Sequence, residues 1–168
     1  MPDAAAMLRS ALAGLGMAYH FSATITVNGA SALSVEGDRI GEGSRMEVAS
    51  NGATVSYVVL PDATWVRASG GAWEVLQDPP ASVDPIEALS APTSLSVPVT
   101  DGQTSQFDAA VPSTSLGVVG DAAVPVHVVL TAGALTKVSY ATVVSNVSAQ
   151  VDTTFGPAID VSEVVAPA

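Results

Sequence analysis

The chain has no cysteine, so neither disulfide bonds nor thiolate chemistry can contribute to its structure or function. It also has only five basic residues against sixteen acidic ones, which gives a net charge of −11. Because phosphate binding requires clustered lysine and arginine, and the basic residues here are dispersed, we exclude nucleic acid as a partner. The same charge disfavours direct adsorption to anionic lipid headgroups. No apolar run approaches the roughly 20 residues of a transmembrane helix.

Side chains suited to catalysis are scarce as well. His20 and His127 are the only histidines, and we interpret both as solvated or hydrogen-bonded structural residues within strands. The chain contains no G-x-S-x-G elbow, no phosphate-binding glycine loop and no zinc-ligand spacing. Glu36 and Asp38 lie two residues apart on one predicted strand face, and we interpret them as solvated acids rather than a cation site. We therefore expect a non-enzymatic protein with no catalytic residues, metal or cofactor.

What the sequence has in quantity is alternation of apolar and polar residues. This period of two predicts antiparallel strands with one apolar and one polar face. Asn28-Gly29, Asn51-Gly52 and Ala132-Gly133 are signals for tight turns between such strands. The predicted strands are Tyr19–Val27, Leu33–Ile40, Arg45–Ala49, Thr54–Leu60, Thr64–Arg67, Trp73–Leu76, Gln106–Val111, Val124–Thr131, Leu135–Val144, Asn146–Phe155 and a short Ala158–Val161.

The first segment of the chain has a helical pattern instead. Residues 3–16 are predicted to form an amphipathic helix with Asp3 as its N-cap. Leu8, Leu12 and Leu15 share one face of this helix. Because the apolar face of the sheet needs a cover, we expect these leucines to pack against its concave side.

A second helical segment is predicted where the alternation stops. The Pro-rich stretch 77–98 is interpreted as a short helical insert, with Asp84 as its cap and Pro85 at its first position. No linker is long enough to divide the chain, so residues 1–168 are predicted to form a single domain.

The apolar residues are mostly small. The chain has 28 alanines and 26 valines, whereas aromatic residues make up only 5%. A sheet lined with alanine and valine can either enclose an open apolar hollow or close into a tightly packed core, and composition alone favours neither. Trp65 and Trp73 flank a Gly70-Gly71 turn, so they are either a packing pair of one hairpin or the rim of a ligand cavity.

The order of several segments is informative. A helix precedes the strand Tyr19–Val27, the hairpin of Thr64–Leu76 is followed by the Pro-rich insert, and Phe155-Gly156-Pro157 lies near the C-terminus. This order resembles the LppX/LprG-type actinobacterial lipoproteins, within the wider LolA/LolB-like group of lipid and lipoprotein carriers. The resemblance covers about residues 4–162 and rests on diffuse motifs with no catalytic signature.

The resemblance implies an α+β, LolA-like fold. In this group a strongly curved antiparallel sheet, an unclosed half-barrel, wraps around an N-terminal helix and a helical insert and encloses a hydrophobic cavity. It also implies an exported lipoprotein, anchored to the membrane in the cell envelope, that binds or transports the acyl chains of envelope lipids or lipoproteins. Members begin with an acylated cysteine, which is absent here, so we expect the sequence to begin after the anchor residue.

Strand phase assigns candidate ligand contacts to the apolar face of the predicted sheet. An acyl chain would be buried there at about 0.8 kcal/mol per methylene. The alternative is an envelope protein-interaction or sensor module that uses the same sheet without a lipid cavity. The candidate ligand-binding residues are Phe21, Ile25, Val35, Val48, Tyr57, Val126, Val128 and Tyr140.

Overall fold

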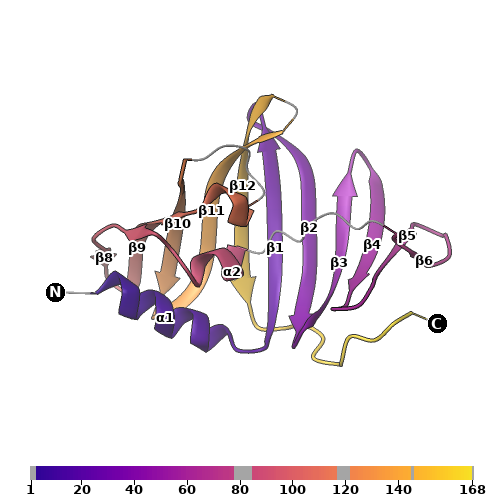
Figure 1. Cartoon of the computed structure of the whole chain (residues 1–168), viewed down its shortest axis with the longest axis horizontal. Coiled ribbons are helices and arrows are strands. Elements are labelled where there is room, and N and C mark those ends of the chain that lie inside the picture. Colours follow the sequence, from indigo (N-terminus) through magenta and orange to yellow (C-terminus); the bar gives the residue numbers. More distant parts are fainter. Residues whose placement is uncertain (1–2, 78–84, 117–121, 145, 168) are drawn as a thin grey trace.

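The computed structural model describes residues 3–77, 85–116, 122–144 and 146–167, whose strands form one antiparallel sheet that does not close (Figure 1). Its strands lie in the order β6-β5-β4-β3-β2-β1-β12-β11-β10-β9-β7, with β8 also paired to β9. The prediction of an unclosed antiparallel sheet with one main helix is confirmed. The strands are β1 (Ala18–Val27), β2 (Ala30–Ile40), β3 (Gly43–Ser50), β4 (Ala53–Val59), β5 (Thr64–Ala68), β6 (Glu74–Val75), β7 (Ser94–Leu95), β8 (Val99–Asp101), β9 (Thr104–Val111), β10 (Val124–Thr131), β11 (Ala134–Val144) and β12 (Val147–Gly156).

The predicted N-terminal helix is confirmed as α1 (Ala4–Leu15). Asp3 caps it, because its carboxylate accepts a hydrogen bond of 3.0 Å from the backbone N–H of Ala5. Gly16 ends the helix with a φ of 65°, which an L side chain would adopt only with strain. Leu8 is buried, whereas Leu12 and Leu15 are partly buried and pack against the same core.

Short turns join the strands where the sequence predicts them. Asn28 and Gly29 have φ values of 52° and 79°, and Asn51 and Gly52 have nearly the same pair. Two consecutive residues with positive φ are typical of the hairpin turn whose twist matches that of the flanking strands. Ala132-Gly133 has the same geometry, with φ values of 53° and 82°.

The Pro-rich region contains more structure than the sequence predicts. Its helix is α2 (Pro85–Leu89), and the predicted cap Asp84 lies outside the described residues. The same region contributes β7, which pairs with β9, and the following chain forms β8. A short 3-10 helix, η1 (Ser113–Leu116), follows β9. Strands of two or three residues give too little alternation to be recognised in a sequence.

The predicted strand Ala158–Val161 is wrong. None of the described residues after β12 forms a strand, and side chains of β2 and β3 hydrogen-bond to backbone groups of this segment instead. Asp38 accepts a hydrogen bond of 3.0 Å from the backbone N–H of Ile159. Arg45 donates to the backbone carbonyls of Asp160 and Ser162, each at 2.8 Å. Further along, Val164 is buried and its side chain lies over Gly43, so this C-terminal segment is packed against the polar face of the sheet.

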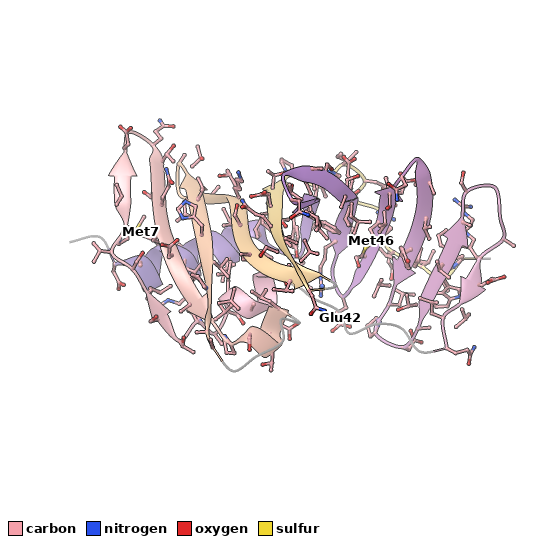
Figure 2. The ribbon with its side chains drawn as sticks, turned by 90° about the horizontal axis from the view of Figure 1, so that it is seen from above. Met7, Glu42 and Met46 are labelled. Atoms are coloured by element: carbon pink, nitrogen blue, oxygen red, sulfur yellow. The ribbon has the colours of Figure 1, made fainter. Side chains whose placement is uncertain are left out.

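The hydrophobic core lies under one half of the sheet. Its buried side chains come from α1, α2, η1 and β9–β12, whereas β1–β6 contribute only Tyr19 and Val58 to the buried apolar residues. Accordingly, α1 makes its main sheet contacts with β11, and α2 contacts β9. We call β7–β12 the covered half and β1–β6 the open half. Seen from above, Met7 of α1 lies on the covered half and Met46 on the open half (Figure 2).

We predict that Leu8→Ala lowers the free energy of unfolding by about 2–5 kcal/mol, because it opens a cavity where α1 meets the sheet. Met17→Ala is the control, since this side chain is 71% exposed and its loss should change stability by no more than about 0.5 kcal/mol. Urea unfolding measures both. Equal stability of the two variants would contradict the packing of α1 on the sheet.

Candidate functional site

Five of the eight predicted ligand contacts lie on one apolar face of the open half. Directly paired residues of neighbouring strands share a face, and Val35 pairs with Val48, which pairs with Val55. A second row runs from Met46 through Tyr57 to Val66. The half-buried apolar side chains on this face include Phe21, Ala23, Ile25, Leu33, Val35, Met46, Val48, Val55, Tyr57, Val59 and Val66.

The apolar face needs a glycine where β2 and β3 approach each other. Gly37 pairs with Met46, and a Cβ atom at Gly37 would lie 2.8 Å from both Cα and Cβ of Met46 and in contact with the carbonyl oxygen of Arg45. These contacts include backbone atoms, which cannot move aside without disrupting the pairing of the two strands. Gly37 therefore keeps β2 and β3 in register beneath the apolar side chains.

The other three predicted contacts lie on the same face of the sheet but in the covered half. Val126, Val128 and Tyr140 are 1%, 0% and 8% exposed, and all three belong to the core that α1 covers. Burial raises the pKa of the Tyr140 hydroxyl, as expected for a phenol enclosed by apolar groups. A ligand could reach these side chains only by displacing α1. The structure thus separates the eight candidates into five on the open half and three inside the core.

The two halves share a continuous apolar surface. Tyr140 pairs with Val151, Val151 with Ile25 and Ile25 with Leu33, so one row of apolar side chains crosses from β11 to β2. Ile25 and Phe155 are partly buried and pack against the core cluster. The face of the open half is therefore the uncovered continuation of the core rather than a separate patch.

Aromatic rings mark the boundary between the halves. Tyr19 lies edge-on to Phe155, with ring centroids 5.9 Å apart, and to Phe21, with centroids 6.5 Å apart. Such edge-to-face contacts stabilise a pair beyond its buried area. The cluster joins β1 to β12 at the point where the helical cover ends.

Both histidines lie on the polar face of the sheet and use both ring nitrogens. His20 lies 3.1 Å from Asp38 through Nδ1 and 3.0 Å from Glu36 through Nε2. His127 has a similar arrangement, with Asp108 and Gln106 as its partners at 2.9 and 3.0 Å. Among the residues that the structure describes, no group of three or more histidine, aspartate or glutamate side chains is arranged to hold a metal ion.

Of the two tryptophans, Trp73 interacts with a cation. The guanidinium of Arg67 lies 4.6 Å from the centre of its ring. Together they contribute to a groove on the polar face of the open half, opposite the apolar face. The sequence alone did not predict this arrangement, because the partners of a strand residue depend on register and on the path of the connecting loop.

No protein-family model matches the chain, and no curated protein matches it. In the described part of the chain, no helix is long and apolar enough to cross a membrane.

The structure predicts different responses to one substitution at two of the candidate positions. Val128→Trp should lower the free energy of unfolding by about 1–3 kcal/mol or more, because it overfills a closed core. Val48→Trp should lower the free energy of unfolding by no more than about 1 kcal/mol, since the indole can extend over the half-buried face. Chemical denaturation distinguishes the two variants. An equal loss of stability would show that the face of the open half is as tightly packed as the core.

Proposed function

We propose that the protein binds acyl chains of envelope lipids or lipoproteins on the apolar face of the open half, without catalysing a reaction. The observation that carries this proposal is the half-buried apolar face of β1–β5, which continues the core beyond the edge of its helical cover. Contiguous apolar surface of this kind is typical of a binding site in a soluble protein.

The chemistry of this face suits a flexible alkyl chain. Its side chains are mainly valine, with leucine, isoleucine, methionine and two aromatic rings. Each methylene that leaves water for such a surface contributes about 0.8 kcal/mol. A chain lying along the paired rows would touch Val35, Val48 and Tyr57 and would reach Ile25 at the edge of the core. In this proposal, burial of the chain provides the affinity.

The resemblance to LolA/LolB-like carriers supports the same assignment. It supplies the ligand class, a LolA-like half-barrel architecture and a location in the cell envelope, where an N-terminal lipid anchor would hold the protein at the membrane. Within this proposal the polar face of the sheet, which carries both histidines, stays outside the acyl-chain site.

The test is binding of a fluorescent fatty acid, 11-(dansylamino)undecanoic acid, to the purified protein. We predict saturable binding with a blue shift of the dansyl emission. Val48→Asn should weaken binding about tenfold or more, because it places an amide among the apolar side chains. Ala49→Asn is the matched control: Ala49 is the next residue of β3 and lies on the opposite face, so binding should stay unchanged.

A double variant, His20→Ala with His127→Ala, should also bind the probe normally, because both histidines lie on the polar face. Thermal unfolding confirms that each variant is folded. Absence of probe binding by the wild-type protein would contradict the proposal. Equal weakening by the two asparagine variants would place the probe elsewhere, and self-association in place of binding would favour the protein-interaction alternative.

A further inference from the structure

The polar face of the open half carries a groove of about 370 Å³. It runs over β1–β5, on the opposite side of the sheet from the proposed acyl-chain site. Its charged and aromatic lining includes His20, Glu36, Arg45, Glu47, Arg67 and Trp73. In a chain with only five lysines and arginines, two of them line this one groove.

Part of the groove already has a structural role. Asp38 is buried and accepts hydrogen bonds from His20 and from the backbone of Ile159. Arg45 donates to two carbonyls of the C-terminal segment and lies 3.6 Å from the carboxylate of Asp160. These two side chains hold the C-terminal segment against the sheet, so they are engaged before any ligand arrives.

Two carboxylates of the groove have no lysine or arginine partner among the residues that the structure describes. Glu36 and Glu47 are direct cross-strand partners, an arrangement in which like charges destabilise a sheet. Glu36 is 65% exposed and contacts His20, whereas Glu47 is exposed. Within the described ranges, neither carboxylate lies within ion-pair distance of a lysine or arginine. The pair thus concentrates negative charge at one end of the groove.

Arg67 supplies the opposite charge at the other end. It lies in the same row as the carboxylates, because Glu47 pairs with Ser56 and Ser56 with Arg67. Two strand spacings therefore separate Glu47 from Arg67, about 10 Å at the backbone. The Arg67 guanidinium stacks on Trp73, and no described carboxylate forms an ion pair with it. Its N–H groups remain able to donate to an anion.

We infer that this groove binds a dipolar ligand. An ammonium or guanidinium group lies between Glu36 and Glu47, and a carboxylate or phosphate accepts hydrogen bonds from Arg67. The body of the ligand crosses the groove beside Val58 and Trp73, which give it an apolar contact. A simple anion is repelled by the two glutamates, and a simple cation leaves Arg67 without a partner. A ligand that carries both charges is therefore needed to match the row.

The test is an NMR titration with three probes at low ionic strength, following the backbone amides of β2–β5. 6-Aminohexanoate carries both charges, and hexylamine and hexanoate carry one each. We predict that 6-aminohexanoate binds about tenfold more tightly than either single-charge probe. Glu47→Gln and Arg67→Gln should each remove most of that advantage. Both side chains are exposed, so the variants should keep the wild-type thermal midpoint.

Matched control variants distinguish the effect of the groove on binding from the effect of the protein's overall charge. Glu42→Gln makes the same charge change at an exposed turn residue outside the groove, and Arg9→Gln does so on α1. Both controls should bind 6-aminohexanoate like the wild type. Equal affinity for hexylamine and 6-aminohexanoate would overturn the dipolar site. So would weakening by Glu42→Gln as large as that by Glu47→Gln, or an absence of shifts in β2–β5.

Discussion

The structure depends on one constraint: the apolar face of a single antiparallel sheet must be covered by other parts of the chain. Strand alternation creates the face along almost the whole length of the chain, but α1 has only twelve residues. Together with α2 and η1 it buries the apolar side chains of β9–β12 and leaves those of β1–β5 half-buried. The division into a covered half and an open half follows directly from this shortage of helical cover.

The two faces of the open half provide different chemistry. The apolar face consists of branched and aromatic side chains that suit an alkyl chain, whereas the opposite face places glutamates and an arginine at fixed spacing. Because successive residues of a strand point to opposite faces, the same strands support both surfaces. In our proposals each surface has its own ligand, and substitutions of adjacent residues can affect one surface without the other.

Much of the fold follows from local patterns in the sequence. The alternation predicts the strands, Asn-Gly pairs predict two of the turns, and Asp3 with Gly16 predicts the ends of α1. The error at Ala158–Val161 has a physical reason: these residues are β-like in composition, but their backbone groups bond to the side chains of Asp38 and Arg45 instead of to a strand. A local pattern does not show such long-range partners.

The candidate site could be predicted only in part for a related reason. Strand phase assigns Val128 and Val48 to the same face of the sheet, but it does not show which part of that face a helix covers. Val128 is fully buried beneath the helical cover and Val48 is not. The groove depends on strand register in the same way. Glu36 lies beside Glu47 only in the register that pairs Gly37 of β2 with Met46 of β3.

We propose that the open half holds an acyl chain in the cell. Native mass spectrometry of the full-length protein, purified in a mild buffer from its own or a related host, tests it most directly. We predict a bound species with the mass of an acyl lipid, which disappears after solvent extraction and is depleted in the Val48→Asn variant but retained in Ala49→Asn. A wild-type protein that always carries only the mass of its polypeptide, or a tightly bound protein in place of lipid, would contradict it.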